Sequence, residues 1–159
     1  MSKFKIQISK LSGFSVIEFL AAAVIGIILT VSVILSFQGF RNGKMLDSAT
    51  DEVLGLINEA RMKTLYSEGD SRYGIRFEAG RAVLFKGTSF SEGDPANKVL
   101  TFSPLLEISG INLSGGGSEV VFERLTGKAD KSGAIALRVK SSGATKNISI
   151  KTTGIVSIQ

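Results

Sequence analysis

The hydrophobic pattern of the chain begins with one long, uncharged apolar run over residues 19–37. About 20 apolar residues are enough to cross a bilayer as a helix. A single carboxylate, Glu18, lies immediately before this run. A charged group at the bilayer centre costs on the order of 2.5–3.5 kcal/mol, and less towards the interface, so Glu18 needs a partner. The pattern predicts a membrane-spanning helix over 14–38 with a carboxylate of specific purpose near its beginning.

Helical periodicity continues beyond the membrane run. Apolar or small residues recur there at three- and four-residue spacing, with charged residues mostly between them: Leu46, Ala49, Val53, Leu56, Ile57, Ala60 and Thr64. This spacing predicts an amphipathic helix over 44–66. No proline occurs before Pro95, and one helix over 14–66 would measure about 80 Å. That length far exceeds a bilayer, so the second half must pack against something outside the membrane.

The periodicity changes to two in the remainder of the chain. Residues 74–79 and 81–86 predict a hairpin joined at Gly80, with Ile75 and Phe77 facing inward. Turn residues separate the further strand candidates, which are 98–103, 108–113, 119–125, 134–140, 147–151 and 155–158. Short antiparallel strands after one long helix predict an α+β fold, with a long N-terminal membrane-spanning helix over 14–66 and a small antiparallel β-sheet head over 67–159.

Composition narrows the chemistry of the head. The 159 residues include no cysteine and no histidine. General-base and nucleophilic catalysis would therefore depend on lysine, serine or carboxylates, and no spaced pair of these stands out. Two Ser-Glu-Gly-Asp segments, 67–70 and 91–94, are typical of turns rather than of a calcium site. The sequence predicts no enzyme, no cofactor and no metal site.

The residues before the apolar run set the orientation of the helix. Lys3, Lys5 and Lys10 precede the run, which by the positive-inside rule keeps the N-terminus in the cytoplasm. A cleaved secretory signal also begins with lysines, but its apolar core is shorter and ends at a small-residue cleavage site. An ordinary single-pass anchor fits the length and leaves Glu18 unexplained. Both remain as alternatives to a dedicated use of Glu18.

An amine is the natural partner for the Glu18 carboxylate. If the chain were cut after Gly13, the new α-amino group of Phe14 would lie one helical turn from Glu18. A charge-assisted hydrogen bond, within one subunit or between two, would then neutralise both groups.

Gly13, Phe14 and Glu18, placed between Lys10 and the apolar run, closely resemble the class III signal of type IV prepilins and type II secretion pseudopilins. The resemblance implies that residues 1–13 are a leader peptide, which prepilin peptidase removes after Gly13 before methylating Phe14. It implies that Glu18 guides assembly with other pilins or pseudopilins into a filament. It also implies a bacterial inner-membrane protein with one span, a cytoplasmic N-terminus and a periplasmic or extracellular head.

The head carries a second resemblance. The order of segments 122–127, 133–139, 148–150 and 153–158 resembles the GspH/FimT domain of minor pseudopilins and minor pilins. Such proteins have a lollipop shape, with the helix as the stick. They are low-copy structural subunits that initiate or cap the filament of a type II secretion system or a type IV pilus. The resemblance implies the same structural role here.

A DNA-binding minor pilin for natural transformation is the alternative. One branch of the family binds DNA through arginines in and beside a Gly-Arg step near the C-terminus, whereas the corresponding step here is Gly154-Ile155. The formal net charge of +5 falls to about +2 without the leader lysines, which is too balanced for a strong polyanion binder by charge alone. Lys140, Lys146 and Lys151 are the candidate phosphate contacts.

Two glycines mark the exit from the membrane. Gly39 and Gly43 weaken helix propensity and have the Gly-x-x-x-Gly spacing that lets helices approach closely inside a bilayer. They lie beside Arg41 at the membrane edge, which favours a hinge over a packing site. Flexibility there would help a subunit leave the membrane.

Overall fold

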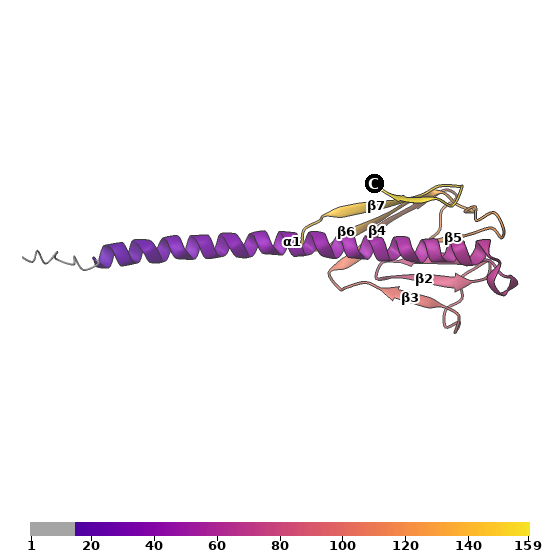
Figure 1. The fold of residues 1–159 in the computed structure, drawn as a ribbon, viewed down its shortest axis with the longest axis horizontal. Helices are drawn as coiled ribbons and strands as arrows, with labels where there is room; N and C mark the ends of the chain where they lie inside the picture. The colour runs from indigo at the N-terminus through magenta and orange to yellow at the C-terminus, as the bar shows by residue number, and fades with distance from the viewer. Residues whose placement is uncertain (1–14) are drawn as a thin grey trace, which may run out of the picture. The chain divides into compact units, whose positions relative to one another are not determined.

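The computed structural model describes residues 15–159, apart from the side chains of Leu35 and Gln38. One long helix, α1 (Val16–Leu65), is followed by a short 3₁₀ turn, η1 (Glu68–Asp70), and then by strands (Figure 1). The strands are β1 (Tyr73–Glu78), β2 (Arg81–Lys86), β3 (Lys98–Thr101), β4 (Leu106–Leu113), β5 (Glu119–Val121), β6 (Gly133–Val139), β7 (Thr145–Ile150) and β8 (Val156–Ile158). The predicted α+β fold, with its long apolar N-terminal helix and antiparallel head, is confirmed.

The chain divides into two compact units, Met1–Gln38 and Gly39–Gln159. The first unit holds the apolar part of α1, which is long and apolar enough to cross a membrane, with a mean hydropathy of 2.6. Its described large side chains between Val16 and Phe37, which do not include Leu35, are exposed. The Thr30 hydroxyl donates to the Gly26 carbonyl at 2.8 Å, and the Ser32 hydroxyl to the Ile28 carbonyl at 2.9 Å. These polar groups are thus satisfied by the helix itself, as an apolar environment requires.

The second unit contains the amphipathic part of α1. Every residue of the predicted apolar stripe is buried: Leu46, Ala49, Val53, Leu56, Ile57, Ala60 and Thr64. Burying a valine, leucine or isoleucine contributes about 1.5–3 kcal/mol relative to exposure, so this stripe is a principal source of head stability. The buried Thr64 hydroxyl donates to the Ala60 carbonyl at 2.8 Å and accepts from the Tyr73 amide at 3.0 Å. This pair of bonds fixes the connection from α1 to β1.

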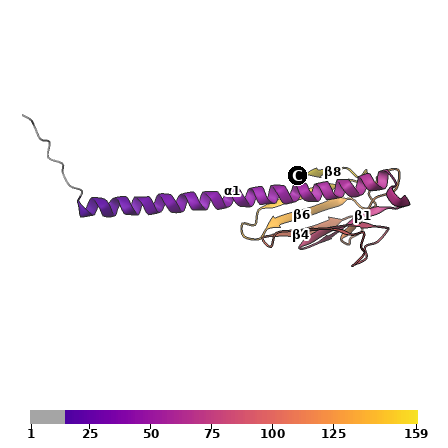
Figure 2. The same cartoon turned by 60° about the horizontal axis from the view of Figure 1, so that its bottom comes forward.

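The strands form two antiparallel sheets rather than the one that was predicted. Their strand orders are β3-β2-β1-β5 and β4-β6-β7-β8. The inner faces of both sheets share one core with the second half of α1, which lies along them in Figures 1 and 2. Ile75 and Phe77 face this core, as the hairpin pattern predicted.

The first sheet is also covered on part of its outer face. Four consecutive residues of β2 are buried, Ala82 to Phe85, although only alternate ones face α1. Phe85 packs edge to face against Phe90, at 5.9 Å between ring centroids. The Phe90 amide donates to the Glu119 carboxylate at 3.1 Å. The connection between β2 and β3 therefore folds back over the outside of the sheet.

The predicted strand over 119–125 is wrong at its end. β5 stops at Val121, and only Phe122 continues the pairing, through a single bridge to Ala129. The Glu123 amide donates to the Lys128 carbonyl and the Gly127 amide donates to the Glu123 carbonyl, both at 2.8 Å. These bonds close a tight loop over 123–128.

Candidate assembly site and its supporting contacts

Glu18 lies in the first turn of α1, where the sequence predicted the assembly carboxylate. The Phe19 amide donates to the Ser15 carbonyl at 3.1 Å, so helical bonding already includes this turn. Negative charge is favoured at a helix N-terminus because unpaired amide groups concentrate there. Gly13 and Phe14, the predicted cleavage and methylation residues, lie outside the described residues.

The surroundings of Glu18 are apolar and exposed. Val16, Ile17 and Phe19 expose 77%, 72% and 69% of their surfaces. Within residues 15–159, no salt bridge engages the Glu18 carboxylate. A carboxylate placed in a membrane or a protein interface is costly unless a cation or hydrogen-bond donor meets it. In either environment, a partner for Glu18 would have to come from the preceding residues or from another molecule.

The candidate hinge glycines lie within an unbroken helix. α1 continues through Gly39 and Gly43, and a Cβ atom at either position would meet nothing within 4 Å. No close packing against the described part of the chain therefore explains either glycine. The division between the two units, after Gln38, falls at the predicted hinge. Flexibility at this point stays a prediction.

The three candidate nucleic-acid lysines do not form one patch. Lys146 and Lys151 are five residues apart along β7 and its end, which corresponds to about 17 Å in an extended strand. Lys140 follows β6 at the opposite end of the β6–β7 hairpin from Lys151. The Lys146 ammonium is 2.6 Å from the Asp47 carboxylate, so it pairs within the chain. Phosphate recognition would thus rest on Lys140 and Lys151, which lie apart.

The ion pair between Lys146 and Asp47 joins β7 to α1 and was missed from the sequence. The two residues are almost 100 positions apart, and neither has a local pattern that signals the contact. The hydrogen bond from Lys146 lowers the pKa of the Asp47 carboxyl group. In β1, the hydrogen bond from Arg81 likewise lowers the pKa of Glu78.

Acidification is expected to destabilise the head where these carboxylates become protonated. A carboxyl group with a lowered folded-state pKa stabilises the fold above its ordinary pKa, which is about 4, and this contribution is lost as the pH falls through the folded-state value. The thermal unfolding temperature of the full chain in detergent, measured by circular dichroism, should therefore decrease when the pH is lowered below about 4.5.

In the variant Asp47→Asn, the thermal unfolding temperature should depend less steeply on pH in this acidic range. Asp51→Asn is the matched control, because Asp51 is an exposed carboxylate one turn further along α1 without an ion pair among residues 15–159. Equal pH profiles for both variants would show that the contact between Asp47 and Lys146 does not stabilise the head.

A second contact missed from the sequence joins the end of α1 to the loop over 123–128, which the last turn of the chain approaches closely. The Arg61 guanidinium donates through Nε to the Gly127 carbonyl at 3.2 Å. Gly154 has φ of +78°, and a Cβ atom there would lie 1.9 Å from the Gly127 oxygen. Gly154 is thus required by a close backbone approach. Ile155, which follows it, is 53% exposed.

The two acidic turns use their carboxylates within the chain. Asp70 pairs with Arg124, and Glu92 accepts from Arg81 at 2.9 Å. Asp94 accepts from the Ala96 amide at 2.8 Å, as an Asx turn does. In the described part of the chain, no three His, Cys, Asp or Glu residues come together in a way that could hold a metal ion.

Comparison with known proteins adds no family to these observations. No protein-family model, curated protein or solved structure matches the chain. The functional assignment therefore rests on Glu18, the apolar surface around it and the way the second half of α1 is buried.

Proposed function

We propose that this chain is a minor structural subunit, a pseudopilin or minor pilin, of a type II secretion or type IV pilus filament. Prepilin peptidase cuts the chain after Gly13 and methylates Phe14. The apolar part of α1 then holds the subunit in the inner membrane until it joins other subunits. Initiating or capping the filament is the role that suits a minor subunit.

One observation carries this proposal: the two parts of α1 differ in whether their apolar side chains are buried by the chain itself. The second part buries its apolar stripe in the head of its own chain. The first part leaves the large apolar side chains that the structure describes exposed on all sides, with Glu18 in its first turn as its single charge before Arg41. A plain membrane anchor needs no carboxylate at that depth. In a helix that moves from a bilayer into a bundle of identical or related helices, such a carboxylate can bond to an amine of a neighbouring subunit.

The mature N-terminus tests this proposal directly. Intact-mass analysis and N-terminal sequencing of the protein, extracted from the membrane of its native cell, should give a chain that starts at N-methylated Phe14. A Gly13→Leu variant, in which the residue before the cut is changed, is the control and should retain its leader. An uncut chain starting at Met1 in the native protein would contradict the proposal and leave an ordinary anchored head.

A further inference from the structure

Strand β3 (Lys98–Thr101) forms an open edge of the first sheet, because it pairs only with β2. The Phe102 amide donates to the Gly80 carbonyl at 2.9 Å, which sets the phase of hydrogen bonding between the two strands. Bonding alternates along antiparallel strands, so Leu100 and Lys98 also bond to β2. The amide and carbonyl groups of Val99 and Thr101 therefore point away from the sheet.

The other sheet edges are less suited to receive a strand. At β5, the Val121 amide donates to the Asp130 carboxylate at 2.8 Å, and the Asp130 amide donates to the Val121 carbonyl at 2.9 Å. At β4, a register shift between Ile108 and Gly110 bends the edge. β8 has only three residues. Bulged, covered or short edges resist pairing with a further strand.

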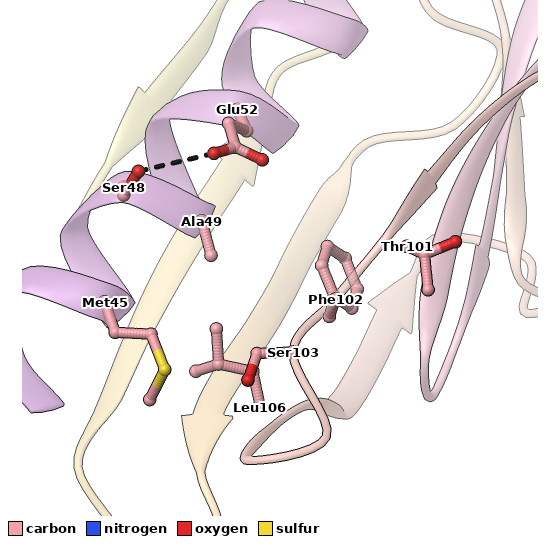
Figure 3. A pocket seen from close by; sticks show the side chains of 8 residues that line it. All are labelled: Met45, Ser48, Ala49, Glu52, Thr101, Phe102, Ser103 and Leu106. Atoms are coloured by element: carbon pink, nitrogen blue, oxygen red, sulfur yellow. Dashed lines mark hydrogen bonds between the residues drawn. The ribbon is translucent and has the colours of Figure 1, made fainter.

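A groove runs between β3 and α1, on the inner side of the edge. It consists of two adjoining cavities of about 360 Å³ and about 240 Å³, which share Glu52. Figure 3 shows the smaller one, where Met45 and Ala49 of α1 face Phe102 and Leu106 across the gap. Apolar and polar side chains both line the groove, and the Lys98 ammonium of β3 pairs with the Glu59 carboxylate of α1 at 2.7 Å within the larger cavity. The groove lies beside an edge with unused hydrogen-bonding groups.

Gly55 adds room to the larger of these cavities. A glycine inside a helix costs about 1 kcal/mol relative to alanine, so a packing reason for it is expected. Among the described residues there is none, because a Cβ atom at Gly55 would meet nothing within 4 Å. An external group that approaches α1 closely at this point would supply the reason.

A third cavity, of about 200 Å³, lies on the outer side of the same edge. Val99 and Val83 are paired across β3 and β2 and both line it, together with Phe90. The edge of β3 therefore has a cavity on each face of the sheet. Successive side chains of a strand point to opposite faces, so an added strand would place alternate side chains in the inner groove and the outer cavity.

We propose that the β3 edge binds an extended peptide segment of a partner protein by strand addition. Main-chain hydrogen bonds to Val99 and Thr101 supply affinity, and the cavities on the two faces select the side chains. The segment carries apolar residues on the face towards α1 and a lysine or arginine beside Glu52. Within residues 15–159, Glu52 is bonded by the Ser48 hydroxyl, at 3.3 Å, and by no cation.

Amide hydrogen exchange, measured by NMR on the full chain in detergent, tests the proposal. The probe is a nine-residue synthetic peptide of alternating valine and threonine with a lysine at each end. In the free protein, the Val99 and Thr101 amides should exchange quickly, while those of Leu100 and Phe102 are protected. Saturating peptide should slow exchange at Val99 and Thr101. No saturable binding at about 1 mM peptide, or binding without this protection, would overturn the proposal.

Two variants separate strand addition from other binding. Val99→Pro removes one outward amide and no bond to β2, so it should weaken peptide binding about tenfold, whereas Val99→Thr keeps the amide and should bind normally. A peptide N-methylated at alternate residues tests the same bonds without changing the protein and should not bind. Protection of Val99 and Thr101 that rises with protein concentration in the absence of peptide would instead indicate a second copy, and would overturn the proposal.

Discussion

Replacing Glu18 with alanine is expected to leave cleavage after Gly13 intact and to reduce incorporation into the filament by at least about tenfold. Two effects act in the same direction. Under the proposed function, the variant loses the charge-assisted hydrogen bond to the Phe14 amine. Its helix is also more stable in the membrane, because the cost of placing a carboxylate there disappears. Each kilocalorie or so that favours the membrane-held subunit lowers the assembled fraction about five- to tenfold.

The measurement is the ratio of mature chain in sheared filaments to mature chain in membranes, by immunoblot. Glu18→Gln keeps the size and hydrogen-bonding capacity of the side chain without its charge. Its incorporation into the filament should be partly or fully lost. Asp51→Ala removes an exposed carboxylate from the part of α1 outside the apolar run, and should assemble normally. Normal incorporation of Glu18→Ala would remove the proposed role of this carboxylate.

The sequence predicted the burial of α1 well because helical periodicity reports directly on which face is apolar. All seven positions of the predicted stripe, from Leu46 to Thr64, are buried. Period-two alternation placed Ile75 and Phe77 inward for the same reason. Alternation does not say which strands pair. β1 pairs with β5, more than 40 residues later in the chain, and this pairing divides the head into two sheets.

Contacts between distant residues with no local pattern were missed. The outer burial of Val83 and Phe85 depends on the return of the loop that carries Phe90, and a continuous apolar run does not identify its cover. The predicted strand over 119–125 was too long because Leu125 is apolar, yet it has φ of +63° and is 75% exposed at a loop tip. An apolar residue in a loop is read as part of a strand when sequence is the only guide.

Of the candidate assembly site, the sequence predicted the residue types and their order. Glu18 lies in the first helical turn, and the apolar run after it is exposed, as a membrane or filament helix requires. Its partner is not found among residues 15–159, because under the proposed function this carboxylate gains its contacts only on processing or assembly. The groove beside β3 had no sequence signal at all, since it arises where α1 passes a strand edge.

Gly154→Ala is expected to destabilise the head by about 2–4 kcal/mol. The added Cβ atom would lie 1.9 Å from the Gly127 oxygen and 2.8 Å from Nε of Arg61. The backbone of one turn would have to move away from the other, which would break the bond from Arg61 to Gly127 and loosen the end of α1. The left-handed φ of +78° adds strain for any residue with a side chain.

Gly143→Ala separates steric overlap from backbone strain. Gly143 has a similar φ of +71°, but a Cβ atom there would meet nothing within 4 Å. It should cost only about 1 kcal/mol, the penalty of the left-handed conformation. Thermal unfolding of both variants in detergent should give a fall in midpoint of more than about 10 °C for Gly154→Ala and of a few degrees for Gly143→Ala. Similar losses would mean that φ alone requires these glycines, and that the approach of the last turn to Gly127 and Arg61 does not hold the C-terminal strand in place.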